Sequence, residues 1–385
     1  MEQDFMVEPD LKFIRDMKKA GGDSLKKCFQ CATCSVVCKL TPDDSPFPRK
    51  EMIWAQWGQK EKLMSDPDVW LCHQCNDCTT NCPRGAKPGD VLAAIRNEAF
   101  THYAFPSFIG KMLSRPAYLP IIMAVPVIIL LAVVGLFGEW EVPVGEIIYA
   151  NFYPELAIDA TFLSFLFFAL ISLGVGLNRF WKAMVERHGQ AGLMGAPVPN
   201  LLAALPTIFA HSKFRTCDEG KERYYGHLGV FYGFVGAFAA SALVMVGYWG
   251  FGIHTPYPTI SLVKLIGNLG GAAIVIGALI VLVKRFSYTK GSTGYNDWVL
   301  IALVLGLGVT GLATQFVRLA DMRGIAYPTY LIHLVFVAYL FLYLPFSKMA
   351  HIAYRTVGMT FARQAQRDLL VSDEVALEAK TAVVK

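Results

Sequence analysis

Residues 72–82 read Cys-His-Gln-Cys-Asn-Asp-Cys-Thr-Thr-Asn-Cys, and Pro83 follows directly. An earlier stretch, residues 28–38, spaces its four cysteines in the same way, as C-x2-C-x2-C-x3-C. This spacing is typical of cubane [4Fe–4S] clusters, because three thiolates set two residues apart wrap a short loop around one cluster. The sequence therefore predicts two [4Fe–4S] clusters.

The fourth cysteine of each run is expected to cross to the other cluster. The predicted ligands are Cys28, Cys31, Cys34 and Cys82 for one cluster, and Cys72, Cys75, Cys78 and Cys38 for the other. Structural zinc prefers two separated cysteine pairs or cysteine–histidine mixtures. A disulfide framework suits a short secreted chain. Neither alternative fits eight cysteines packed into two runs.

Composition indicates a membrane protein. The chain has 385 residues, of which 54% are hydrophobic and 17% are charged, whereas soluble domains carry about 25% charged residues. Six apolar stretches each have about the 20 residues that a helix needs to cross a bilayer. They cover residues 117–137, 156–178, 228–250, 262–283, 298–318 and 328–350.

Charges in the connections predict the orientation of these spans. Residues 138–155 and 251–261 contain no Lys or Arg, whereas residues 179–226 are rich in both. The N-terminus is polar and shows no cleavable signal peptide. We therefore expect a multi-pass protein of the cytoplasmic (inner) membrane, with both termini and the iron–sulfur region in the cytoplasm.

Histidines near the predicted spans are candidate haem ligands. His333 and His351 are 18 residues apart, which is five helical turns and about 27 Å along a helix. That layout, with one histidine per leaflet on one helix face, is typical of a cytochrome b with two haems. His227 lies level with His351 and is its expected partner. For His333 the alternatives are Met245 and His254, and the competing interpretation is interfacial histidines that water satisfies.

Two further histidines lie near these candidate sites. His211 is a possible competitor for the inner haem. His73 follows a predicted cluster ligand; the alternatives there are tuning of the cluster and a solvated side chain, and we expect the solvated side chain.

The expected architecture is mainly α. Residues 1–105 are expected to form a bacterial ferredoxin-like α-helical domain with two [4Fe–4S] clusters. Residues 106–355 are expected to form a six-helix transmembrane cytochrome b bundle, and residues 356–385 a cytoplasmic tail.

These features together favour an electron conduit between a lipid-soluble quinone and a cytoplasmic redox enzyme. No nucleic-acid partner is indicated, and no catalytic side chain is assigned. The alternative from another class is a membrane transporter with a regulatory cluster domain, which a missing b-type haem spectrum would favour.

Residues 333–351, together with His227 to Phe231, resemble the gamma subunit of respiratory nitrate reductase. That resemblance implies haem ligation by His227, His333 and His351. The family has a second histidine ten residues after the first, where this chain has Ala237. This departure concerns the second ligand of the outer haem.

The first 105 residues resemble the small iron–sulfur subunit of heterodisulfide reductase. The matching stretches are residues 28–38, 47–49, 69–83 and 93–96. The fusion of the two parts, with residues 38–44, is similar to the membrane subunit of the quinone-interacting membrane-bound oxidoreductases of sulfate reducers.

This second resemblance implies menaquinol as substrate, haem b and no FAD in this chain. It also implies two flavin/iron–sulfur partner subunits of the heterodisulfide reductase A type, with adenylylsulfate reductase as the acceptor. A heterodisulfide-reductase-like or sulfite-reductase-linked complex is the alternative within redox chemistry.

Overall fold

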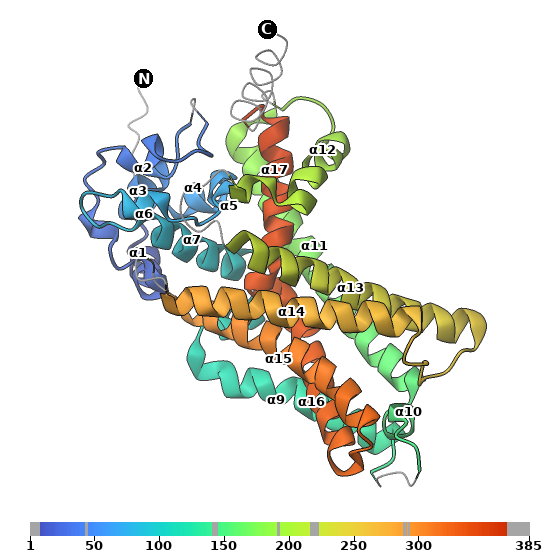
Figure 1. Ribbon diagram of the computed structural model, residues 1–385. Helices are drawn as coiled ribbons and strands as arrows, with labels where there is room; N and C mark the ends of the chain where they lie inside the picture. Colours follow the sequence, from blue (N-terminus) through green and yellow to red (C-terminus); the bar gives the residue numbers. More distant parts are fainter. Residues whose placement is uncertain are drawn as a thin grey trace.

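The computed structural model describes residues 8–42, 45–140, 145–190, 193–215, 223–287, 291 and 293–367, and every regular element within these ranges is helical (Figure 1). The mainly α prediction is therefore confirmed. The chain forms an N-terminal head of short helices and a bundle of long helices (Figure 1).

The head consists of short helices around one longer helix. Its elements are α1 (Leu11–Met17), α2 (Thr33–Val36), α3 (Arg49–Gln56), α4 (Lys60–Met64), α5 (Asp68–Leu71), α6 (Asp77–Thr80) and α7 (Pro88–Tyr103). Helix α7 carries the core of the head, because Val91, Leu92 and Ile95 on its inner face are fully buried. The short helices leave most of the cluster-binding sequence in loops.

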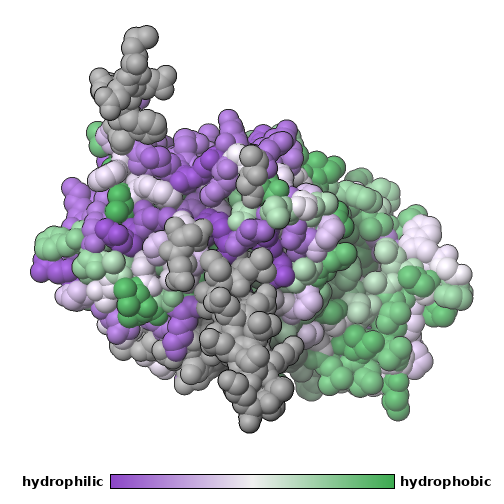
Figure 2. All heavy atoms as spheres, turned by 90° about the horizontal axis from the view of Figure 1, so that it is seen from above, coloured by the Kyte–Doolittle hydropathy of each residue, from purple (hydrophilic) through white to green (hydrophobic). Residues whose placement is uncertain are grey.

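Six helices are long and apolar enough to cross a membrane, as the sequence predicts. They are α9 (Leu119–Phe137), α11 (Glu155–His188), α13 (Arg223–Phe251), α14 (Leu262–Ser287), α15 (Tyr295–Leu319) and α16 (Arg323–Tyr343). Short helices α8 (Ser107–Leu113), α10 (Tyr149–Phe152), α12 (Pro197–Ala210) and α17 (His351–Gln364) connect or flank them. Figure 2 shows hydrophilic side chains gathered on the head and hydrophobic ones on the bundle.

Helices α13 and α14 lie side by side over most of their length (Figure 1). Glycines make this close approach possible, since a Cβ atom built on Gly233 would lie 2.8 Å from the carbonyl oxygen of Gly270. One built on Gly277 would lie 2.6 Å from the carbonyl oxygen of Gly226. Small residues at such an interface let helix backbones pack directly in a membrane.

The last predicted span is not one continuous helix, so the expectation for His333 and His351 is wrong in this respect. Helix α16 ends at Tyr343, two 3-10 turns follow at Leu344–Phe346 and Lys348–Ala350, and α17 begins at His351. Pro345 cannot donate the helical hydrogen bond, and Ser347 is extended (φ −117°, ψ 174°). The two histidines therefore do not share a helix face, and the 27 Å separation does not follow.

An aromatic cluster joins the head to the bundle. The Trp70 ring of α5 stacks on Tyr354 of α17 with 4.9 Å between centroids, and it meets Phe180 of α11 edge-on at 6.0 Å. Phe180 is fully buried and Tyr354 is 1% exposed. Such contacts combine burial with favourable ring geometry, so they fix the head against the bundle.

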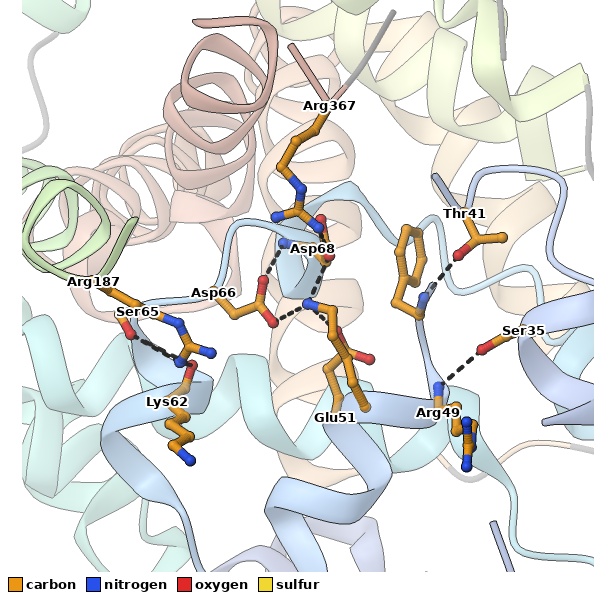
Figure 3. Close-up of polar contacts among 12 residues, drawn as sticks. Ser35, Thr41, Arg49, Glu51, Lys62, Ser65, Asp66, Asp68, Arg187 and Arg367 are labelled. Atoms are coloured by element: carbon orange, nitrogen blue, oxygen red, sulfur yellow. Dashed lines mark hydrogen bonds and ion pairs between the residues drawn. The ribbon is translucent and has the colours of Figure 1, made fainter. Parts of the chain in front are cut away.

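Buried charges make a second connection (Figure 3). The Lys50 ammonium lies 2.9 Å from Glu51 Oε1 and 2.7 Å from Asp68 Oδ2, and it also pairs with Asp66. Arg367 pairs with Asp68 from the C-terminal side. Burial raises the pKa of Glu51 to about 8, against the opposing effect of Lys50. Glu51 is therefore protonated at neutral pH, which leaves two carboxylates facing two cations.

The C-terminal helix α17 packs against the head. Helix α17 runs across the expected boundary between the bundle and the tail, after residue 355, and packs against α5 and α12. Arg187 at the end of α11 donates to the carbonyl oxygen of Lys62 at 2.5 Å (Figure 3). The chain beyond residue 367, which includes most of the predicted tail, lies outside the described residues.

Candidate functional site

The two cysteine runs fold into matching loops. Gln30 and Gln74, at the same place in each run, have φ values of 62° and 53°, and Ala32 and Asn76 have values of 69° and 75°. Such left-handed backbone is uncommon outside glycine. A one-turn helix, α2 or α6, follows each loop, and the two helices lie together. The repeat in the sequence is therefore a repeat in the backbone.

Cys28, Cys31, Cys34 and Cys82 come together in the head. Burial raises the pKa of the Cys28 thiol, and the neighbouring Cys82 and Cys31 raise it further. Burial likewise raises the pKa of Cys34 to about 11, with Cys28, Cys31 and Cys82 as neighbours. Cys82, the fourth cysteine of the second run, thus lies beside the first run.

Cys38 makes the reciprocal crossing. A cavity of about 350 Å³ is lined by the sulfur-bearing residues Cys38, Cys72, Cys75 and Cys78. Burial raises the pKa of Cys38 to about 12. A thiol with that pKa stays protonated at neutral pH until a metal replaces the proton. The donor set therefore suits a metal centre.

Hydrogen bonds reach the cysteine sulfurs. The Gln74 amide N–H donates to Cys72 Sγ and the Ala86 amide N–H donates to Cys82 Sγ, each at 3.3 Å. Hydrogen bonds to the sulfurs are one of the means by which a protein sets the potential of an iron–sulfur cluster.

Three histidines gather where the head meets the bundle. The rings of His227 on α13 and His351 on α17 have centroids 5.9 Å apart. His211 Nε2 lies 2.9 Å from His227 Nδ1, and His351 Nδ1 lies 2.6 Å from the Lys348 carbonyl oxygen. Each Nδ1 is thus engaged, which leaves Nε2 of His227 and His351 as the nitrogen open to a metal. Burial lowers the pKa of His351 to about 4, so its ring is neutral at pH 7.

His211 contacts this pair from the end of α12, close to the inner haem site at which the sequence analysis placed it as a competitor. It ends helix α12 in a left-handed conformation with a φ value of 50°. Its ring is buried, and it contacts His227 rather than replacing it. An unusual backbone at a functional site is a recognised cost of placing a side chain.

Two arginines connect the histidines to the second cysteine loop. Arg355, one turn after His351, donates to the carbonyl oxygens of Leu71 and Cys72 at 3.1 and 3.3 Å. Arg223, one turn before His227, donates to the carbonyl oxygen of Gln74 at 2.6 Å. Both histidine-bearing helices therefore hold the backbone of this loop. The sequence did not predict this role for either arginine, although each lies four residues from a candidate histidine.

His73 completes the connection, and the expectation of a solvated side chain there is wrong. Arg355 contacts His73 Nε2, and His73 Nδ1 is buried. The His73 ring lies 4.7 Å from Phe214, and Phe214 lies 5.3 Å from His227, measured between centroids. Aromatic side chains thus span the distance from the cysteine loop to the histidines.

Of the remaining predicted histidines, His254 lies just after α13 at the far end of the bundle, and His333 lies at the middle of α16. His333 Nδ1 lies 3.1 Å from Thr310 Oγ1, and His254 Nδ1 lies 2.8 Å from Glu155 Oε2. Across the described parts of the chain, no hydrogen bond or ring contact joins His254 to His333.

The fold and the cysteine loops define a class: a membrane protein that carries an iron–sulfur head for electron transfer. A family profile described as "4Fe-4S dicluster domain" matches residues 24–86, and the profile of citrate utilization protein B matches residues 115–369. The second match covers most of the chain. The protein therefore belongs to the citrate utilization protein B family.

Individual relatives match either the whole chain or its iron–sulfur head alone. Citrate utilization protein B of Escherichia coli is 29% identical over 379 residues, 93% of each chain. The C subunit of the H2:CoB-CoM heterodisulfide, ferredoxin reductase of Methanothermobacter marburgensis is 39% identical over 110 residues, 26% of this chain. A protein of Archaeoglobus profundus, named for its likeness to the C subunit of heterodisulfide reductase, is 35% identical over 102 residues.

The chain matches 59% of the length of the Methanothermobacter protein and 54% of that of the Archaeoglobus protein. No solved structure matches the chain. The matches support an iron–sulfur electron-transfer protein similar to the small C subunit of heterodisulfide reductase.

Proposed function

We propose that this protein transfers electrons between a quinone in the membrane and a flavin-containing partner, through one haem b and two [4Fe–4S] clusters. One observation carries the proposal. Two neighbouring imidazoles, His227 and His351, lie on helices whose arginines both bond the backbone of the same cysteine loop.

The histidine pair fits a haem. An imidazole nitrogen binds a transition metal at about 2 Å, and rings with centroids 5.9 Å apart leave room for a metal between them. A bound haem would supply a one-electron carrier. His211 and the Lys348 carbonyl oxygen would hold the two rings through Nδ1, as outer partners of metal-bound histidines commonly do.

The cysteines fit the clusters in the crossed pattern. We propose Cys28, Cys31, Cys34 and Cys82 as ligands of one cluster, and Cys38, Cys72, Cys75 and Cys78 as ligands of the other. The second set lines a single cavity. The resulting order from the bundle is haem, second cluster, first cluster.

The two arginines would serve this route as positioning residues. Arg223 and Arg355 keep the loop around Cys72 at a fixed place relative to His227 and His351. Their positive charges also favour a centre that becomes more negative on reduction. Both effects favour passage of an electron between the histidine pair and the head.

The head is proposed to lie on the cytoplasmic side of the inner membrane. The argument is the excess of Lys and Arg in residues 179–226 compared with residues 138–155 and 251–261, which places the head-side connections in the cytoplasm. We further propose a domain boundary near residue 105, where α7 ends and the bundle begins.

The proposed partners follow from the relatives. Proteins similar to the head are C subunits of heterodisulfide reductases, so a flavin/iron–sulfur subunit of the heterodisulfide reductase A type is the proposed partner at the head. Menaquinone is the proposed quinone. Adenylylsulfate reductase as acceptor has only the resemblance to the sulfate-reducer subunits in its favour.

Anaerobic purification in detergent tests the proposal. We expect about eight iron atoms in clusters and about eight acid-labile sulfides per chain, one haem b, and reduction of that haem by menadiol, a soluble hydroquinone. A chain with full iron and sulfide but no b-type spectrum would support the transporter alternative with a regulatory cluster domain.

A further inference from the structure

A second cavity lies close to the histidine pair. Its empty space, counted together with the open solvent at its mouth, is about 330 Å³, and it lies between the start of α15, the end of α16 and the turns that precede α17. Leu113, Leu300 and Leu303 supply aliphatic walls, and Tyr339 and Lys348 supply polar groups. Small-molecule sites combine apolar walls with a few placed polar groups.

The buried hydroxyl of Tyr339 is the evidence for a ligand in this cavity. Tyr339 is 3% exposed, and its hydroxyl has no hydrogen-bond partner among the described residues. Tyr343, whose ring centroid is 4.8 Å away, differs because its hydroxyl donates to the Ile122 carbonyl oxygen at 2.9 Å. A buried hydroxyl without a partner is unfavourable. An acceptor atom in the cavity would satisfy it.

The cavity is one contact away from the proposed haem ligand. Lys348 lines it, and the carbonyl oxygen of Lys348 accepts the hydrogen bond from His351 Nδ1. The Lys348 ammonium is held by Asp297, which Arg285 also contacts at 3.3 Å. Lys348 is therefore fixed by an ion network through its side chain, and its carbonyl oxygen bonds the histidine.

The geometry points to a binding site for the ring of a quinone, with the Tyr339 hydroxyl donating to a ring oxygen and the aliphatic walls packing on the ring. The inference rests on the proposed function and names the site of the same reaction. A lipid acyl chain would fill the apolar part but offers no acceptor to Tyr339. A quinone supplies both a flat apolar ring and oxygen acceptors.

The position also suits electron transfer better than the far end of the bundle does. Trp249, near the far end of α13, is 22 residues beyond His227, or about 33 Å along a helix. A quinone at that end would need a further carrier. One in the cavity is next to the residue that holds His351.

The test compares Tyr339→Phe with Tyr343→Phe in the full chain in detergent, with menadiol as the probe. We expect Tyr339→Phe to raise the menadiol concentration for half-maximal haem reduction about ten-fold, the effect of one lost hydrogen bond. The dithionite-reduced spectrum should not change. Tyr343→Phe should leave the menadiol dependence unchanged and lower the thermal midpoint, because it loses the bond to Ile122.

A second variant and a photolabel keep the inference open to refutation. Val299 also lines the cavity, so Val299→Phe should fill the cavity and weaken menadiol binding without removing Tyr339. A photoreactive azido-naphthoquinone should label peptides from the start of α15 or from residues 347–349, and excess menadiol should prevent the labelling. Labelling at the far end of the bundle would overturn the site.

The outcomes separate the two proposals. If menadiol does not reduce the haem of the unmodified protein, the proposed function fails. If menadiol reduces it with saturation, while Tyr339→Phe and Val299→Phe match the unmodified protein, quinone binds elsewhere. Only the present inference then fails, and an acyl chain becomes the better occupant of the cavity.

Discussion

The two ends of the helix bundle hold their histidines in different surroundings. At the head, His211, His227 and His351 lie within contact of one another. Farther from the head, His333 at the middle of α16 bonds a threonine hydroxyl, and His254 at the far end bonds a carboxylate. The sequence presents candidate histidines on both sides of the membrane, but among the described residues only the head-side histidines lie in contact with one another across helices. Position at a membrane boundary is therefore weaker evidence for a haem than a partner across the helices.

The largest expected difference between the ends is in haem content. His351→Ala should abolish the b-type spectrum, because one of the two proposed axial ligands is lost. His333→Ala, the matched variant, should keep the full haem content. The measurement is haem per chain by pyridine haemochrome, with iron and sulfide assays to show that the head still holds its clusters. Haem lost from the His333 variant and kept in the other would reverse the comparison.

The second-largest difference is expected in stability, when a charged side chain is removed from the head or from the far end. Lys50→Met leaves three buried acidic side chains around a missing ammonium, and breaking such a buried group costs about 3–5 kcal/mol of stability. At the far end, Arg323 pairs with Asp321 on the surface, so Arg323→Met should show no measurable change. Denaturant unfolding in detergent micelles, followed by tryptophan fluorescence, compares the two variants. Equal stability would mean that the head network adds nothing.

A smaller difference is expected in the rate of haem re-oxidation, when an arginine that bonds a loop is replaced at either end of the bundle. Arg355→Gln should slow re-oxidation of the haem by an acceptor at the head about 10-fold, the usual effect of losing an outer partner at a metal site. Arg318 bonds the Ile147 carbonyl oxygen and Glu146 at the far end, and Arg318→Gln should leave this rate unchanged. Stopped-flow absorbance after menadiol reduction measures both. A slow rate in both variants would indicate a general loss of fold.

The smallest effect is expected at His254. Its side chain is 69% exposed and its partner is Glu155, a kind of pair that contributes less than about 1 kcal/mol. His254→Gln should retain the haem and its reduction by menadiol. A clear loss of haem in this variant would show that His254 is a ligand after all and would restore a site at the far end.

The local parts of the structure were predictable from the sequence. Cluster loops depend on residues close together in the chain, so the two cysteine runs give matching backbones at Gln30 and Gln74. The six spans follow from runs of apolar residues, because length and hydropathy are local properties. The break after α16 also had a local signal, Pro345. Our sequence interpretation gave more weight to the spacing of His333 and His351 and therefore predicted a continuous helix.

The contacts between distant segments were not predictable in this way. Arg355 meets Cys72 across 283 positions of the chain, and Arg223 meets Gln74 across 149. Neither residue differs in sequence from an ordinary positive charge at a membrane boundary. Likewise, the Tyr339 hydroxyl is distinguished from that of Tyr343 only by what packs around it.

The place of α17 late in the chain bears on biogenesis. At about 5–20 residues per second, the ribosome releases the cysteine loops many seconds before His351 and Arg355 emerge. Until α17 is synthesised, the cysteine loops lack its contacts: the stacking of Tyr354 on Trp70 and the hydrogen bond from Arg355 to the Cys72 carbonyl oxygen. Assembly of the proposed haem site is then a late event, and a chain truncated before α17 would lack both His351 and the aromatic contact of Tyr354 with Trp70.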